Sequence, residues 1–124
     1  MSIGNTRRSS TLLSFLSNRV VPTSTQIGPW LDLREYEGDI VFVLNYESPP
    51  GISTLLFTFS ESDEASGSNS STLTNHETQR GVNDSEAIIF KVDEIKRYAR
   101  VTARVLRSGT AAASVTALAR KKYT

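Results

Sequence analysis

Residues 39–61 read DIVFVLNYESPPGISTLLFTFSE, and this stretch decides the fold. Two runs rich in β-branched, aromatic and leucine residues, 40–46 and 54–59, stand on either side of a Pro-Pro-Gly break. Runs of this kind around a turn signal are typical of strands, and these two predict a pair of antiparallel strands. The first run has no polar residue before Asn45, which predicts a position at the centre of its sheet.

Later segments repeat the two-residue alternation of a half-buried strand. We expect further strands at 87–92, 98–106 and 111–120, with no long helix between them. Several short strands separated by turn signals predict an all-β fold, an antiparallel β-sandwich or jelly roll. The positions that alternate inward predict the core: Phe42, Leu44, Leu55, Phe57, Phe59, Ile88, Phe90 and Val101.

Length and composition limit the class of protein. A chain of 124 residues predicts one domain with a modest core. It has no cysteine, which excludes a disulfide framework and a cysteine-ligated metal site. The longest apolar run is far shorter than the roughly 20 residues that cross a bilayer. The N-terminal region lacks the apolar core of a signal peptide, so we expect a protein made and used without secretion and with no membrane partner.

The N-terminal region differs in composition from the rest. We expect an arm over residues 1–24, followed by the β-sandwich over 25–124. Apolar residues gather in the arm, and their spacing leaves a short helix and an extended strand equally open. These apolar arm residues are candidate contacts to other subunits: Leu12, Leu13, Phe15 and Leu16.

The most polar segment is 62–85, which has little apolar surface to offset the entropy of ordering. We expect a mobile loop there, with a weak edge strand near 72–74. Residues 93–96 predict a single helical or tight turn that Asp93 caps.

No combination of residues indicates catalysis. His76 is the only histidine, and it lies in the polar segment without an evident orienting partner. The acidic run 61–64 lacks the alternating carboxylates of a calcium loop. We therefore expect a protein that is not an enzyme, with no catalytic residue, no cofactor and no metal site.

Two groups of residues offer alternatives. Basic residues crowd the expected C-terminal hairpin, where Arg100 and Arg104 share one face of a strand, and such a sheet can bind a partner subunit. Direct nucleic-acid binding is not expected, because a pI of about 8.1 is modest and the aromatic–glycine signature of an RNA-binding sheet is missing. Trp30 and Tyr36 could instead form a carbohydrate platform.

Three segments carry a resemblance to a known class of proteins: LREYEGDIVFVL at 33–44, FSESDE at 59–64 and VDEIKRYARV at 92–101. The chain resembles, over roughly residues 30–120, small virion structural proteins of tailed bacteriophages, most of all capsid decoration (cement) proteins with jelly-roll or sandwich folds. It departs from them after residue 64, where it lacks the tryptophan that such proteins often carry.

This resemblance implies a non-enzymatic role on the exterior of the virion capsid, in a protein made in the host cytoplasm. It implies the major capsid protein as partner, and a homo-oligomer. Two other roles remain open: a head–tail joining or tail protein of the virion, and a carbohydrate-binding β-sandwich module. An array of many copies would make even weak contacts add up to firm attachment.

Overall fold

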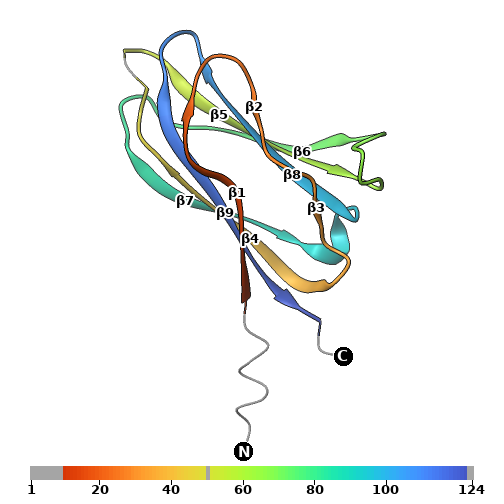
Figure 1. The fold of residues 1–124 in the computed structure, drawn as a ribbon. Helices are drawn as coiled ribbons and strands as arrows, with labels where there is room; N and C mark the ends of the chain where they lie inside the picture. Colours follow the sequence, from red (N-terminus) through yellow and green to blue (C-terminus); the bar gives the residue numbers. More distant parts are fainter. Residues whose placement is uncertain (1–9, 50, 123–124) are drawn as a thin grey trace, which may run out of the picture.

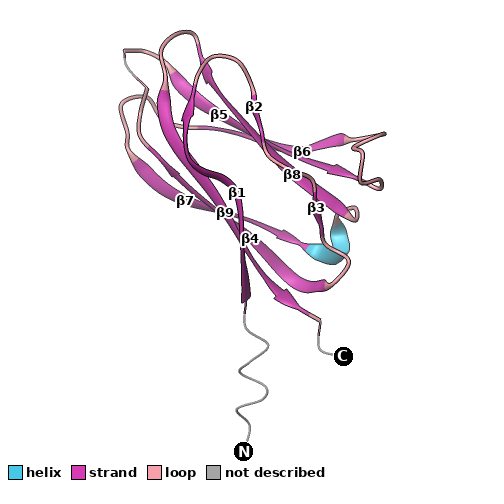
Figure 2. Cartoon of the chain, in the orientation of Figure 1, coloured by secondary structure: helices cyan, strands magenta, loops and turns pink. Residues whose placement is uncertain are grey.

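The computed structural model describes the backbone of residues 10–49 and 51–122, with side chains described from Val21 onward. This part of the chain contains nine strands and one 3₁₀ turn, η1 (Val92–Glu94) (Figures 1 and 2). The strands are β1 (Ser10–Val21), β2 (Gln26–Ile27), β3 (Leu31–Asp32), β4 (Tyr36–Tyr46), β5 (Thr54–Ser62), β6 (Ser71–Glu77), β7 (Asp84–Lys91), β8 (Tyr98–Leu106) and β9 (Ala111–Lys121).

The strands form two antiparallel sheets that pack face to face (Figure 1). One sheet has the order β1-β9-β4-β7, and the other β2-β8-β5-β6 with β3 also paired to β8. Strands from the two halves of the chain pair in nested order: β1 with β9, β2 and β3 with β8, β4 with β7, and β5 with β6. Successive pairs in this order lie in alternate sheets. The pairings β4–β9 and β5–β8 close the roll. The fold is therefore an all-β sandwich with jelly-roll topology, as predicted.

The core lies between the sheets and follows the predicted alternation. Phe42 of β4 meets Phe59 of β5 edge-on, with ring centroids 5.2 Å apart. Alanines on β8 and β9 occupy inward positions of their strands and leave room for these rings. Ile88 and Phe90 are half-buried and pack against the core from the edge strand β7. Six of the predicted core residues are fully buried: Phe42, Leu44, Leu55, Phe57, Phe59 and Val101.

The two runs that flank the Pro-Pro-Gly break do not pair with each other. β4 lies between β9 and β7, at the predicted central position, whereas β5 belongs to the opposite sheet. The connection crosses from sheet to sheet, and the buried Ser53 ties it down by donating its hydroxyl to the carbonyl of Ser108 at 2.6 Å. The predicted hairpin is wrong because the runs bury their faces against each other rather than sharing a ladder. β8 and β9, expected as a C-terminal hairpin, also lie in different sheets.

The segment expected as an N-terminal arm is extended and belongs to the sandwich from Ser10 onward. β1 pairs antiparallel with β9, from Ser10 opposite Arg120 to Val21 opposite Ala111. Ladder pairing with β9 makes this stretch an edge strand, and the division into an arm over residues 1–24 and a sandwich over 25–124 stays a prediction. Residues 1–9 lie outside the described residues.

The polar segment 62–85 contains a full strand rather than one long loop. β6 pairs with β5, so only short connections remain on either side of it. In the first of these, the hydroxyl of Ser62 donates to the carbonyl of Ser68 at 2.8 Å and accepts the amide of Glu64 at 3.1 Å. The mobility of this segment stays a prediction.

The turn expected at 93–96 begins one residue earlier than predicted. η1 starts at Val92 with Lys91 at its N-cap, and no side chain caps it. The prediction that Asp93 caps the turn is wrong, because Asp93 already lies inside it.

Candidate functional site

The two arginines singled out from the sequence lie on the outer face of β8 but in different environments. Arg100 is half-buried and stacks on Trp30, with its guanidinium carbon 4.3 Å from the ring centroid. Its Nε is buried and has no hydrogen-bond partner among the described residues. Arg104 is exposed, and four residues of strand separate the two by about 13 Å. They therefore do not form one joint cationic site.

Trp30 and Tyr36 do not form the exposed platform that the carbohydrate alternative requires. Tyr36 is buried in the core cluster. Trp30 is half-buried, with Arg100 over its ring and Gly67 packed closely against its indole. The indole of Trp30 thus joins the β5–β6 connection to β8, and Arg100 occupies one of its faces.

His76 has an orienting partner that the sequence did not reveal. Its Nε2 lies 2.7 Å from Oε2 of Glu86, and the same oxygen accepts the hydroxyl of Tyr46 at 2.7 Å. His76 comes from β6, whereas Glu86 and Tyr46 come from the opposite sheet, so the cluster bridges the open side of the sandwich. These hydrogen bonds join the edges of the two sheets, and we call the three residues the clasp.

The cluster shifts the titration of two of its members. Hydrogen bonds from Tyr46 and His76 lower the pKa of Glu86. Burial, followed by the hydrogen bond to Glu86, raises the pKa of Tyr46 well above its usual value. Both shifts favour the hydrogen-bonded state, in which a neutral tyrosine donates to a charged carboxylate.

A second pair ties β3 to the start of β8. Arg97 donates from Nε and Nη2 to the two carboxylate oxygens of Asp32, at 3.1 and 2.9 Å. Asp32 also accepts the backbone amide of Arg34 at 3.0 Å. The hydrogen bond from Arg97 is the main cause that lowers the pKa of Asp32 to about 2.

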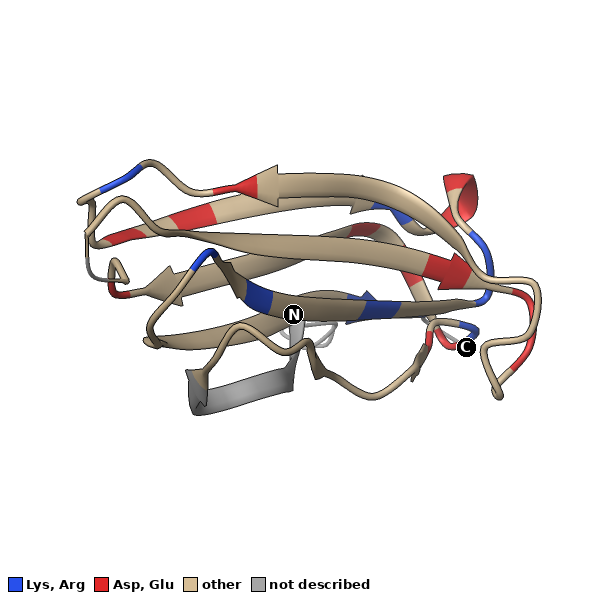
Figure 3. Cartoon of the chain, turned by 90° about the horizontal axis from the view of Figure 1, so that it is seen from above, with Lys and Arg blue, Asp and Glu red and all other residues tan. Residues whose placement is uncertain are grey.

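The outer surface of the four-stranded sheet carries an apolar patch, which we call the apolar face. It consists of Val41, Val43, Ala87, Ile89 and Leu118. The register sets Ile89 opposite Val41, and Val41 opposite Leu118, so one apolar row crosses three strands. Ile89 is 59% exposed. In Figure 3 most charges lie toward the strand ends and connections, and long central stretches of strand carry none.

The sequence carries a signal for this apolar face in the run 40–46. The first run is apolar on both sides up to Asn45, and this correctly predicted a central strand. Since only one side of that strand faces the core, the same pattern also indicates an uncovered apolar surface on the other side.

The backbone of β1 places one of the four predicted contact residues, Leu12, in register with this face, whereas Leu13 and Leu16 lie opposite residues of β9 that face the core. Leu12 lies at the register position opposite Leu118, and Leu16 at the position opposite Val115. Leu13 lies opposite Ala117, and Phe15 falls at a register shift between Ser14 and Leu16. The apolar row Ile89–Val41–Leu118 therefore ends at the register position of Leu12.

The described residues include no group of three or more His, Cys, Asp or Glu side chains that could hold a metal ion. In the same part of the chain, no helix has the length and apolarity needed to cross a membrane.

No family model matches the chain, and no curated protein sequence matches it. Several solved structures have a similar fold. A protein of Bacillus endospore appendages, described as disulfide-linked pili, superposes with a TM-score of 0.57 at 9% identity, covering 93% of this chain and 90% of the other. The absence of cysteine here rules out the same linkage.

Two structures of infectious bursal disease virus are also similar. One, of the Gx strain, has a TM-score of 0.59 at 10% identity, and one of the VP2 subviral particle has 0.58 at 9% identity. Each match covers 90% of this chain and 32% of the viral chain, so this chain spans about a third of the length of those proteins. At these identities the likeness shows the fold alone, a jelly-roll sandwich that also occurs in structural proteins of a virus and of a spore appendage.

Proposed function

We propose that the chain is a non-enzymatic structural protein of a bacteriophage virion, which decorates and stabilises the assembled capsid from outside. Its partners are the major capsid protein and further copies of itself. The observation that carries the proposal is the apolar row Ile89–Val41–Leu118 on a sheet surface that no other element of the described chain covers. The jelly-roll fold and the resemblance to decoration proteins support it.

Exposed apolar area argues for a covering partner. Removing apolar surface from water stabilises a complex by about 25 cal/mol per Å², and large patches on soluble domains mark interaction sites. A flat sheet face suits a capsid surface, where many equal subunits repeat and weak contacts act together. The edge strand β1 extends the proposed contact along the same sheet at the register position of Leu12.

A matched pair of substitutions tests the contact. Ile89 and Ile27 are equally exposed, at 59% and 58%, but Ile27 lies on β2 of the opposite sheet. We expect Ile89→Lys to abolish co-sedimentation with purified capsids that lack this protein, whereas Ile27→Lys binds as the wild type does. Both variants should melt at the wild-type temperature, since neither side chain is buried.

Two other outcomes would contradict a capsid contact through the apolar face. If both variants bind normally and Arg104→Glu does not, the contact lies on the outer face of β8. If the wild type does not bind capsids at all, the decoration role is wrong. Mass spectrometry of purified virions then decides the alternative, because a head–tail joining or tail protein is present in few copies per particle and a decoration protein in many.

A further inference from the structure

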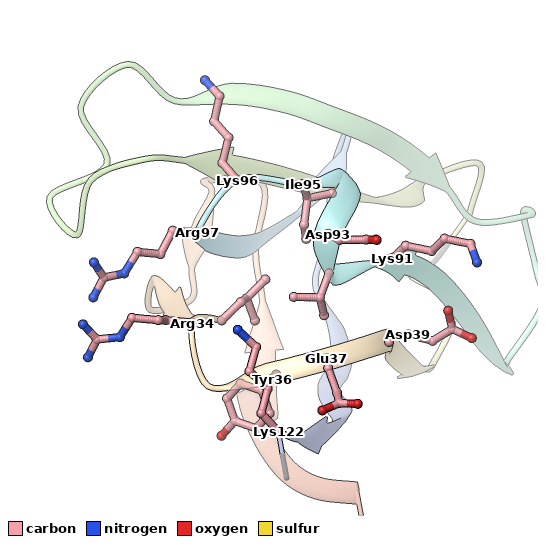
Figure 4. A pocket seen from close by; sticks show the side chains of 13 residues that line it. Arg34, Tyr36, Glu37, Asp39, Lys91, Asp93, Ile95, Lys96, Arg97 and Lys122 are labelled. Atoms are coloured by element: carbon pink, nitrogen blue, oxygen red, sulfur yellow. The ribbon is translucent and has the colours of Figure 1, made fainter. Parts of the chain in front are cut away.

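A cavity of about 520 Å³ opens at one end of the sandwich (Figure 4). It is lined by three segments that the jelly roll brings together: residues 33–39 at the start of β4, residues 91–97 around η1, and Lys122 just after β9. Its size is in the range of cavities that bind small organic molecules.

The inner wall of the cavity is apolar. Leu33 is 1% exposed, and Tyr36 also belongs to the buried core cluster. Val92 and Ile95 are half-buried and pack against that cluster from the side of η1. The cavity therefore opens directly onto the edge of the core, where an apolar group of a ligand would leave water.

The opening is lined by charges of both signs, five cations and three carboxylates. In Figure 4 the side chains of Arg34 and Arg97 lie on one side, and those of Asp39, Asp93 and Lys91 lie on the other. Lys122 extends from the end of its strand toward the middle of the ring of labelled side chains.

The cations differ in how far they are already paired. The guanidinium of Arg97 is held by Asp32, as described above. The charged groups of Arg34 and Lys122 make no hydrogen bond or ion pair within the described part of the chain. Arg34 and Lys122 therefore line the same cavity as the apolar side chains and have hydrogen-bond donors available to a ligand.

We propose that this cavity binds a small carboxylate with an apolar body. The body lies on Leu33, Val92 and Ile95, and the carboxylate accepts hydrogen bonds from Arg34 and Lys122. The planar fork of an arginine matches a carboxylate, and a charge-assisted bond of this kind is stronger than a neutral one.

Such a group has two sources, a free organic acid or the C-terminal residue of a peptide. The test titrates the ¹⁵N-labelled full chain with 4-phenylbutanoate and with its neutral counterpart 4-phenylbutanamide. A second pair of probes is acetyl-Ala-Phe with a free or an amidated C-terminus. The tighter binder of the two free carboxylates identifies the source.

We expect saturable amide shifts confined to residues 33–39 and 91–97, with a dissociation constant below about 5 mM for a ligand of this size. Each amide should bind at least tenfold more weakly than its acid. Arg34→Gln combined with Lys122→Gln should cause a similar loss, since two charge-assisted bonds disappear. Arg104→Gln, which removes an exposed cation on β8, should leave the affinity unchanged.

Three results overturn the proposal: no saturable shift up to about 5 mM, equal affinity for acid and amide, or unchanged affinity in the double variant. A thermal melt of the double variant confirms that it is folded. Its two side chains are exposed, so the melt should match that of the wild type.

Discussion

The rings of Phe42 and Phe59 meet edge-on between the two sheets, with centroids 5.2 Å apart and ring planes at 64°. Each residue is 1% exposed. Phe90 joins them from the edge strand β7, 5.9 Å from Phe42 and 5.7 Å from Phe59. This contact is where β4 and β5, neighbours in sequence but members of opposite sheets, hold the sandwich together.

Replacing either ring of this contact should destabilise the fold strongly. We expect Phe42→Ala and Phe59→Ala each to lower the free energy of unfolding by about 3–5 kcal/mol, because each leaves a cavity in a packed core. In a double-mutant cycle the pair should couple by about 0.5–1.5 kcal/mol, the contribution of an edge-on ring pair beyond its buried area. Urea unfolding measures all four proteins, and a coupling near zero would contradict a direct ring contact.

Strand positions were predictable here and strand partners were not. Alternation along 98–106 is a local property, and it identified both the strand and its inward residue Val101. Pairing in a jelly roll joins distant strands, such as β1 and β9 near the two ends of the chain. Residues 40–46 and 54–59 therefore looked like a hairpin, although each pairs elsewhere.

The candidate sites were predicted less well for the same reason. Arg104 was correctly placed on an outer face, but the stacking of Arg100 on Trp30 depends on β8 lying beside the segment before β3. The contact between His76 and Glu86 joins strands of opposite sheets. No pattern within either strand could indicate it, since residues ten apart in a polar segment have no fixed spatial relation.

The clasp of His76, Glu86 and Tyr46 should make the free energy of unfolding fall at alkaline pH. The pKa of Tyr46 is raised above its usual value of about 10. Its contribution is therefore fully present below pH 10 and is lost as the pH rises toward the raised value. We expect Tyr46→Phe to melt below the wild type at pH 8, with the gap narrowing above pH 10. Because the other tyrosines and the lysines titrate in both proteins, their effects cancel in the difference.

At acidic pH the same clasp should lose the contribution of Glu86 to stability as the pH falls. The pKa of Glu86 is lowered, so its contribution is present above the usual carboxyl range and is lost as the pH falls through the lowered value. We expect Glu86→Gln to be less stable than the wild type at pH 7, with the gap narrowing as the pH is lowered from 7 to 2. A gap that stays constant between these pH values would show that the carboxylate charge of Glu86 does not matter.

The ion pair between Asp32 and Arg97 should be visible in the titration of the aspartate. The wild-type side chain should titrate with a pKa of about 2, and in Arg97→Gln the pKa should rise toward 3.8. Carboxyl ¹³C shifts across pH 1.5–6 measure it. The stabilisation is present above pH 4 and is lost as the pH falls toward 2. The pair is 40% exposed on both sides, so water screens it and it should contribute little to the free energy of unfolding.

Gly67 and Trp30 make a contact that tolerates no added methyl group. Gly67 has φ +82°, and a Cβ built on it would lie 2.8 Å from Cε2 and 2.9 Å from Cζ2 of the Trp30 indole. Gly81 is the matched control, because its φ of +75° is similar but a Cβ there would meet nothing within 4 Å. The two alanine variants thus share the backbone strain and differ only in the collision.

We expect Gly81→Ala to cost about 1–2 kcal/mol from the left-handed backbone alone, and Gly67→Ala to cost a further 1–3 kcal/mol from overpacking. Trp30 is the only tryptophan, so its fluorescence reports on this site without a label. In Gly67→Ala the indole must move away from the β5–β6 connection, and its emission should shift to the red. Gly81→Ala should keep the wild-type spectrum. Identical spectra and equal stabilities in the two variants would mean that Trp30 does not pack on Gly67 in solution.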